Sequence, residues 1–337
     1  MRTERITLDH GGGGRASRQL ISELFLTYLG NQALNALEDA ADFKNEPGRL
    51  AMTTDAYVVS PIFFPGGDIG SLAVHGTIND LAMRGARPLA LSAAFILEEG
   101  LPLADLEQVA ASMAKAAKEA GVAVVAGDTK VVGRQAADKI FITTAGVGCI
   151  PPGRHISVHL ARPGDQVILS GSLGEHGVAI LASRAGLKLQ TPVISDSAAL
   201  SGLVEVLAQA LGDRLHCLRD PTRGGLASVA NEIAQASGVG LELEEEAILV
   251  KPAVAAACEI LGLDPLYLAN EGKLVAIVAA EAAREALAVL RSHPLGQEAA
   301  RIGQVVADHP GRVALRTRIG GQRLVDLLWG EQLPRIC

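Results

Sequence analysis

The spacing of apolar and polar residues divides the chain into alternating helical and extended segments. The clearest helix is Leu103–Ala120, which follows Pro102, ends at Gly121 and keeps apolar residues three or four positions apart. The same criteria predict helices at Ser17–Leu29, Ser71–Arg84, Val178–Arg184, Ser197–Ala210, Leu226–Ser237, Ala253–Leu261 and Ala283–Ser292. Apolar runs of strand length predict strands at Leu50–Thr54, Tyr57–Ser60, Ala90–Leu97, Val122–Ala126, Lys139–Ile150, Asp165–Gly171, Gly240–Glu244 and Lys273–Ala280.

The segment IPPGRHISVHLARPGD, residues 150–165, interrupts this pattern because it is rich in proline and glycine and has no clear periodicity. Each side of it mixes strands and helices, so we predict a two-domain α/β or α+β architecture. The expected parts are a glycine-rich arm (1–35), an N-terminal domain (36–155), a C-terminal domain (156–320) and a tail (321–337). Gly330 and Pro334 predict that the tail is flexible and extended rather than a regular element.

Composition narrows the class of protein. The 337 residues are 49% hydrophobic and 20% charged, which suits a globular protein with a large core, and the net charge of −7 argues against a nucleic-acid-binding surface. No apolar run reaches the roughly 18 residues that span a bilayer, and the N-terminus lacks the apolar core of a signal peptide. We therefore predict a cytoplasmic protein that uses neither membrane nor nucleic acid.

The four cysteines also suit a cytoplasmic protein, but one of them has no evident structural role. Cys149, Cys217, Cys258 and Cys337 are widely scattered with no CxxC pair, so neither a zinc site nor a redox motif is expected. Core packing accounts for the first three. Cys337 is the last residue of the sequence, where packing rarely needs a thiol.

Acidic residues recur at predicted strand ends and in a helix. Asp55 ends TTD, Asp80 follows Asn79 within a predicted helix, and Asp128 opens DTK after an apolar run. One such aspartate is ordinarily a turn or cap residue. Several of them, each beside Gly, Thr or Asn, favour a Mg²⁺ site shared with substrate phosphates.

The stretch DPTRGG gives a further candidate. Asp220 is predicted to cap a helix whose first residue is Pro221. Such a helix start binds phosphate well, and Arg223 adds a guanidinium. A well-capped helix without any ligand is the alternative.

Three other stretches allow two interpretations each. The run HGGGGR, with Gly12 and Gly13, is either a lid over phosphates or a disordered terminus. SGSLGEHG lacks the phosphate-loop arrangement GxxxxGK[ST], and its His176 is either catalytic or structural. Glu271 in NEGKLV is either a general base or a turn residue.

The motifs TTDAYV, NDLAMRGA, GDTKVV, SGSLGEHG, DPTRGG and NEGKLV, in this order, resemble the ATP-using superfamily of aminoimidazole ribonucleotide synthetase, selenophosphate synthetase and thiamine-phosphate kinase. FFPGGDIGSLAVHGTINDLA, KPAVAAACEILGLDPLYLANEGKLV and the terminal PRIC are closer still to the HypE family of hydrogenase-maturation carbamoyl dehydratases. The resemblance extends from His10 to Cys337. One departure is Gly12, since the family often has HGSGG where this chain has HGGGG, which removes a possible hydroxyl contact.

The resemblance implies a PurM-like two-domain fold, a homodimer formed mainly by the N-terminal domains, and ATP with Mg²⁺ near their interface. It implies metal and phosphate contacts at Asp55, Asp80, Asp128 and Asp220. It places nucleotide contacts at Asn79, Thr129, Thr222, Arg223, Gly224, Gly12 and Gly13. Catalytic roles fall to Cys337, Glu271 and Lys130.

The implied reaction modifies the last residue. A carbamoyl group from carbamoyl phosphate reaches Cys337 through the partner HypF, ATP drives its dehydration to a thiocyanate, and the cyano group passes to iron on the HypC–HypD complex as a ligand of the [NiFe]-hydrogenase centre. Two alternatives are an ATP-dependent synthetase or kinase for a free small molecule, and a nonenzymatic nucleotide-binding scaffold whose tail is a docking peptide.

Overall fold

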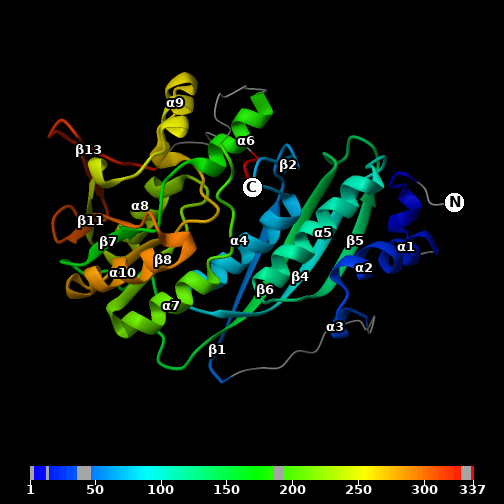
Figure 1. The fold of residues 1–337 in the computed structure, drawn as a ribbon, viewed down its shortest axis with the longest axis horizontal. Coiled ribbons are helices and arrows are strands. Elements are labelled where there is room, and N and C mark those ends of the chain that lie inside the picture. The colour runs from blue at the N-terminus through cyan, green and yellow to red at the C-terminus, as the bar shows by residue number, and fades with distance from the viewer. Residues whose placement is uncertain (1–3, 13–14, 36–46, 186–192, 328–334) are drawn as a thin grey trace.

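The computed structural model describes residues 4–12, 15–35, 47–185, 193–327 and 335–337. Its first half contains a four-stranded sheet in the order β1–β6–β4–β5 (Figure 1). The strands are β1 (Arg49–Tyr57), β4 (Arg87–Glu98), β5 (Val124–Val132) and β6 (Ile140–Ile150). β6 is antiparallel to both neighbours and β4 is parallel to β5, which leaves β1 and β5 as the two edges. A small hairpin, β2 (Phe63–Phe64) and β3 (Gly67–Asp68), precedes the first long helix.

Helices α4 (Ile69–Met83) and α5 (Leu103–Glu119) cover one face of this sheet (Figure 1). α5 buries the apolar stripe that its sequence predicts, and Asp68 caps α4 by accepting from the backbone of Gly70 and Ser71. The opposite face stays open: Leu50 and Met52 of β1 are 60% and 74% exposed, and Ile96 of β4 is 39% exposed.

The N-terminal residues lie at the β5 edge. A helical stretch runs from α1 (Arg15–Leu20) through a π-helical turn (Ile21–Phe25) to α2 (Leu26–Leu29), followed by α3 (Gln32–Asn35). The Phe25 ring packs on Phe95 of β4, with 4.8 Å between the ring centroids. The predicted helix Ser17–Leu29 is therefore confirmed, with a π-helical turn in its middle.

The second half builds a seven-stranded sheet in the order β13–β12–β9–β11–β7–β10–β8. Its strands are β7 (Gln166–Leu169), β8 (Leu215–Arg219), β9 (Gly240–Glu244), β10 (Val275–Val278), β11 (Ala300–Val306), β12 (Val313–Arg316) and β13 (Gln322–Leu324). Its helices are α6 (Glu175–Ala185), α7 (Ser201–Leu211), α8 (Gly225–Ser237), α9 (Pro252–Leu261) and α10 (Ala283–Ser292).

Alternation along the central strands assigns the helices to opposite faces of this sheet. Val275 and Ile277 pack with the core under α8, whereas Ala276 and Val278 pack with the core under α7 and α10. The two halves meet mainly through α4, which contacts α7 and β8 (Figure 1). No helix in the described ranges is long and apolar enough to cross a membrane.

Three local predictions are wrong. β1 runs from Arg49 to Tyr57 as one strand, so Tyr57–Ser60 is not a separate strand. β5 continues to Val132, so Asp128 lies within a strand rather than after one, because pairing with β4 extends through GDTKVV. Asp220 caps no helix: α8 begins at Gly225, and Gly224 is its N-cap with φ 74°.

The glycines explain the displaced helix start. Gly225 also has positive φ, and a Cβ there would lie 2.5 Å from the Leu266 carbonyl oxygen. The chain therefore turns between Asp220 and Gly224 and packs closely on residues 266–268 before the helix can begin.

Candidate active site

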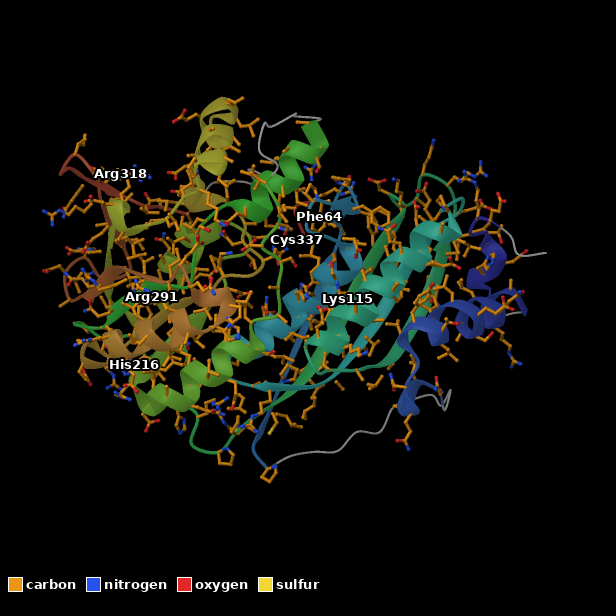
Figure 2. All side chains as sticks on the ribbon, viewed as in Figure 1. Phe64, Lys115, His216, Arg291, Arg318 and Cys337 are labelled. Atoms are coloured by element: carbon orange, nitrogen blue, oxygen red, sulfur yellow. The ribbon has the colours of Figure 1, made fainter. Side chains whose placement is uncertain are left out.

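The end of the chain is docked rather than free. The backbone N–H of Val58 donates to a main-chain oxygen of Cys337 (3.1 Å), and that of Ser60 donates to the carbonyl oxygen of Arg335 (3.3 Å). Ile336 is buried between these contacts. Figures 1 and 2 show the C-terminus and Cys337 in the region between the two sheets, where Cys337 is partly exposed. Residues 335–337 thus lie along the segment that follows β1, whereas residues 328–334 of the predicted flexible tail lie outside the described part of the chain.

Glu271 is the buried carboxyl group of the site. It is only 3% exposed, and its Oε1 has no hydrogen-bond partner among the described residues. Burial raises the pKa of Glu271 well above its ordinary value, and repulsion from Asp220, Asp196 and Asp55 raises it further, whereas Arg223 lowers it. Glu271 therefore takes up a proton readily and has one oxygen available for a ligand.

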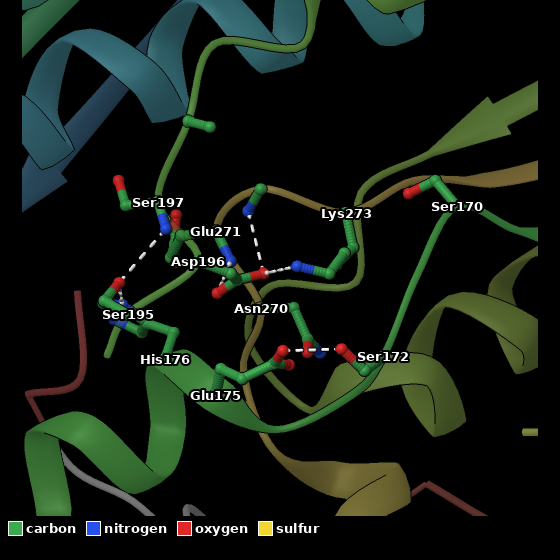
Figure 3. Close-up of polar contacts among 12 residues, drawn as sticks. Ser170, Ser172, Glu175, His176, Ser195, Asp196, Ser197, Asn270, Glu271 and Lys273 are labelled. Atoms are coloured by element: carbon green, nitrogen blue, oxygen red, sulfur yellow. Dashed lines mark hydrogen bonds and ion pairs between the residues drawn. The ribbon is translucent and has the colours of Figure 1, made fainter. Parts of the chain in front are cut away.

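The turn that carries Glu271 is fixed from two sides. The Asp196 carboxylate accepts from the backbone N–H groups of Glu271 and Gly272, both at 3.2 Å, and pairs with Lys273 Nζ at 3.1 Å (Figure 3). A Cβ on Gly272 would lie 1.8 Å from the Asp196 carbonyl oxygen, so this approach needs glycine. The side-chain amide of Asn79 donates to the Glu271 carbonyl oxygen at 3.2 Å.

Asn79 is a predicted nucleotide contact, but its side-chain amide already forms hydrogen bonds within the protein. Besides bonding to Glu271, its Nδ2 donates to the Ala198 carbonyl oxygen (3.0 Å), and its Oδ1 accepts from the backbone N–H of Leu200 (2.8 Å). Asn79 therefore joins α4 to the start of α7 and positions the Glu271 turn. Contact with a nucleotide stays a prediction for this residue.

Three of the four predicted metal-binding acids come together on the helix-covered side of β1. Burial and repulsion from Asp80 raise the pKa of Asp55, and burial with repulsion from Asp80 and Asp55 raises the pKa of Asp220 to about 7. Thr77 donates to Asp55 Oδ2 at 2.9 Å, and Thr53 donates to Asp80 Oδ2 at 2.7 Å. These carboxylates repel one another, and cation binding would relieve that repulsion.

The donor set of Asp55, Asp80 and Asp220 fits Mg²⁺, because carboxylate oxygens are its preferred protein ligands and substrate phosphates complete its shell. The described residues contain no group of three or more His, Cys, Asp or Glu side chains already arranged around one metal position. The three acids thus lie within electrostatic reach of one another but do not form a closed cage of ligands.

Asp128, the fourth predicted acid, lies on β5, away from the other three, where it is paired with Ala94 of β4. β5 is three strands from β1 in the sheet, about 14 Å at ~4.8 Å per strand. Because paired residues share a face, Asp128 and Lys130 lie with exposed Ile96 on the open face, opposite the side of the sheet that Asp55 occupies. Lys130 Nζ is 3.7 Å from Asp128 Oδ2, and both side chains are exposed.

A cavity of about 510 Å³ lies at the β5 edge, within the size range of small-molecule sites. Apolar side chains of α1–α3 and β4 line it, together with the predicted nucleotide contacts Gly12 and Thr129 and with Asp128 and Lys130. Gly13, the remaining predicted contact of the arm, lies outside the described residues.

The DPTRGG turn brings Arg223 to the acidic group. Arg223 is exposed, acts electrostatically on both Asp55 and Glu271, and makes no direct ion pair within the ranges that the structure describes. Thr222 shapes the turn, since its backbone N–H donates to the Asp220 carbonyl oxygen and its own carbonyl oxygen accepts from Gly225. Arg223 is thus a cation beside the acids that is free to contact a phosphate.

His176 and Ser195 belong to the site although sequence reasoning did not assign them to it. His176 Nε2 lies 2.8 Å from the Ile336 carbonyl oxygen, and His176 Nδ1 lies 2.8 Å from Ser195 Oγ. The sequence offered His176 as either catalytic or structural, and no spacing signal links it to a residue 160 positions away.

Replacing Asp220 with Asn should stabilise the metal-free protein at neutral pH. The pKa of Asp220 is raised from 3.8 to about 7 in the folded state, so its stabilising contribution is complete below pH 3.8 and is lost as pH rises through about 7. That difference corresponds to at most about 4 kcal/mol at pH 8. Urea unfolding in EDTA should show Asp220→Asn gaining about 2–4 kcal/mol at pH 8 but only about 1 kcal/mol at pH 4.5. Equal gains at both pH values would contradict the prediction.

Comparisons with known proteins cover essentially the whole chain. Residues 37–150 match the family model described as AIR synthase related protein, N-terminal domain, and residues 162–316 match the corresponding C-terminal domain. The chain is 58% identical over 337 residues to carbamoyl dehydratase HypE of Azotobacter vinelandii, covering 100% of this chain and 98% of that protein.

Solved structures agree with these sequence matches. A crystal structure of hydrogenase maturation protein HypE in complex with ATP is 55% identical, with a TM-score of 0.94 over 98% of this chain and 99% of the other. The crystal structure of a HypE–HypF complex matches at 48% identity, with a TM-score of 0.81 over 92% of this chain and 99% of the other. The mixed α/β fold of the PurM-like type is thereby confirmed.

Proposed function

Because the chain belongs to the HypE family of carbamoyl dehydratases, enzymes of hydrogenase maturation, we propose that it uses ATP to convert an S-carbamoyl group on its own Cys337 into a thiocyanate. The observation that carries this proposal is the docking of Cys337 on Val58. Val58 follows Tyr57, whose pKa is raised by burial and also by the charges of Asp55, Glu271 and Asp80. The end of the chain therefore lies beside the acidic site rather than at a distant surface.

Partners follow from the family. HypF would deliver the carbamoyl group, and a solved HypE–HypF complex among the matching structures supports this partner. The HypC–HypD complex would accept the cyano group as an iron ligand. Both transfers would require Cys337, whose tail is held along residues 58–60, to leave its docked position and return.

The chemistry requires activation before elimination. A thiocarboxamide oxygen leaves poorly, so its attack on the γ-phosphorus of ATP, with loss of the first N–H proton to water, forms a C–O–P bond and releases ADP. A base then removes the remaining N–H proton, the C–O bond breaks, and phosphate leaves as the C≡N triple bond forms. The elements of water thus depart in phosphate, and only acid–base and phosphoryl chemistry is needed.

Glu271 and Arg223 would supply the base and the positive charge that these steps need. The free Oε1 of buried Glu271 would take the N–H proton, and its raised pKa makes it a stronger base than an ordinary carboxylate. Arg223 would contact the transferred phosphoryl group. Because the surroundings of Glu271 bury it, little water would reach an activated intermediate beside it.

Asp55, Asp80 and Asp220 would hold Mg²⁺. When bound, the ion supplies positive charge that screens the phosphates of ATP. The carboxylates themselves would lose their mutual repulsion, and the pKa of Asp220 would fall from its raised value.

A second copy of the chain would complete the nucleotide site. The open face of the four-stranded sheet exposes Leu50, Met52 and Ile96, an apolar patch that a homodimer would cover. Asp128 and Lys130 lie on that same face, far from the Asp55 edge of their own chain. A two-fold partner that brings its β1 edge to this β5 edge would unite the four acids, with the adenosine of ATP in the cavity behind Gly12.

The test is modification of the protein itself. After incubation with HypF, carbamoyl phosphate and Mg-ATP, intact mass should show the gain of one carbamoyl group and then the loss of one water, and peptide mapping should assign both to Cys337. An unmodified Cys337, or a carbamoyl form that survives Mg-ATP, would overturn the proposal. Turnover of a free small molecule after removal of the tail would favour a synthetase or kinase instead.

A further inference from the structure

We propose that His176 and Arg184 of α6 form a docking site for the backbone of the last three residues, and that residues 195–198 transmit docking to the Glu271 turn. This inference rests on the proposed function, since it assigns a positioning role for a tail that carries the substrate. It can be tested separately from that function, because docking can be measured without the dehydration reaction.

The His176 ring is fully buried and its hydrogen atoms can be assigned. The Ile336 carbonyl oxygen can only accept, so Nε2, at 2.8 Å, carries the hydrogen. Burial keeps the ring neutral by lowering its pKa, so Nδ1 accepts from the Ser195 hydroxyl at 2.8 Å. Ser195 Oγ in turn accepts from the backbone N–H of Ser197 at 3.2 Å. All donors of this chain are therefore satisfied while the tail is docked, and the Nε2–H of His176 depends on the tail for its acceptor.

Arg184 supplies the second contact. The Arg184 Nη2 atom donates to the Arg335 carbonyl oxygen at 2.8 Å and to the Ser60 carbonyl oxygen at 2.8 Å. Together with His176 it binds two consecutive peptide carbonyls of the tail. These contacts recognise the backbone of residues 335 and 336, so the same site can accept the thiol, the carbamoyl thioester and the thiocyanate.

The link to the base runs through four residues. Ser195 contacts the docking histidine, and the next residue, Asp196, accepts from the backbone N–H groups of Glu271 and Gly272 (Figure 3). At the other end of the segment, the backbone N–H of Ala198 donates to the Glu271 carbonyl oxygen at 3.3 Å. A docked tail thus fixes residues 195–198, and these fix the turn that aims Glu271.

A buried histidine satisfied within the core would be the simpler explanation, but its partner here is a segment that must leave. When the tail departs to meet a partner protein, the Nε2–H of His176 loses its protein acceptor and Ile336 loses its burial. Both changes are unfavourable, so these contacts favour return of the tail. This drive acts equally on modified and unmodified tails.

Alkylation of Cys337 by a maleimide measures docking directly, because Cys149, Cys217 and Cys258 are buried. We expect His176→Ala and Arg184→Ala to raise the alkylation rate about tenfold, as loss of one buried hydrogen bond predicts. His176→Gln retains an N–H donor near the Nε2 position and should restore a rate close to that of the original protein. The control is His159→Ala, because His159 is exposed and bonds to the Ala236 carbonyl oxygen rather than to the tail.

The transmitted effect has its own measurement. Once HypF has loaded the carbamoyl group, single-turnover dehydration by Ser195→Ala should be about tenfold slower while its affinity for ATP is unchanged. Unchanged alkylation in Arg184→Ala and in folded His176→Ala would overturn the docking site, and normal dehydration by Ser195→Ala would overturn the link. If His176→Ala does not fold, the Arg184 and Ser195 variants decide. Failure of the unsubstituted protein to dehydrate would reject the proposed function and leave the alkylation result valid.

Discussion

Replacing Cys337 with serine should abolish carbamoyl uptake and everything that follows from it. A serine hydroxyl is a far weaker nucleophile than a thiol near neutral pH, so HypF would find no acceptor on the tail. The backbone contacts of residues 335 and 336 do not involve the thiol, so the serine tail should still dock. Intact mass after incubation with HypF and carbamoyl phosphate should show no adduct, whereas ATP affinity measured by calorimetry should equal that of the original protein.

The matched control is Cys258→Ser, because Cys258 is a second cysteine, buried in α9. This variant should take up and dehydrate one carbamoyl group normally, with only a loss of stability from a hydroxyl in the core. Carbamoylation of Cys337→Ser at the usual rate would place the acceptor on another residue and reject the tethered-substrate mechanism. Loss of ATP binding in Cys337→Ser would instead show that the thiol serves the nucleotide site.

Local patterns predicted those elements whose ends are set by their own residues. The bounds of Gly240–Glu244 and Ala283–Ser292 agree with the structure to the residue, because each has a clean periodicity bounded by breaks in the pattern. The apolar stripe of α5 is equally local, and its burial follows directly from helical spacing.

Other elements depend on distant residues and escaped prediction. β8, β11, β12 and β13 were not predicted, since these strands exist through pairing across the seven-stranded sheet. The wrong helix cap at Asp220 has a similar cause, since close packing of Gly225 on residues 266–268 moves the helix start. Neither contact leaves a periodic trace in the sequence.

The same difference between local and distant determinants applies to the candidate site. Chemical reasoning selected Asp55, Asp80, Asp220 and Glu271 as site residues, and the structure brings them within electrostatic reach of one another. The sequence did not reveal that Asp128 lies on the opposite face, because face and edge follow from strand order rather than spacing.

Replacing Glu271 with Gln should stall the protein at the carbamoyl stage. Glutamine keeps the size and the backbone bonds to Asp196 but cannot take the N–H proton, so the activated intermediate should not eliminate. Loss of a general base typically slows a reaction by about 10²–10⁴-fold. Single-turnover mass spectrometry should show the carbamoyl form of Cys337 persisting in Mg-ATP.

The matched control is Glu175→Gln, because Glu175 is also a buried carboxyl group with an oxygen unpartnered among the described residues, but it lies at the start of α6 and bonds Ser172. This variant should dehydrate normally. The pH profile gives a second test: since the pKa of Glu271 is raised, its basic form accumulates as pH rises, and the dehydration rate should rise with it. Glu271→Gln should lose that rise. Normal dehydration by Glu271→Gln, with the pH dependence intact, would assign the base to another residue.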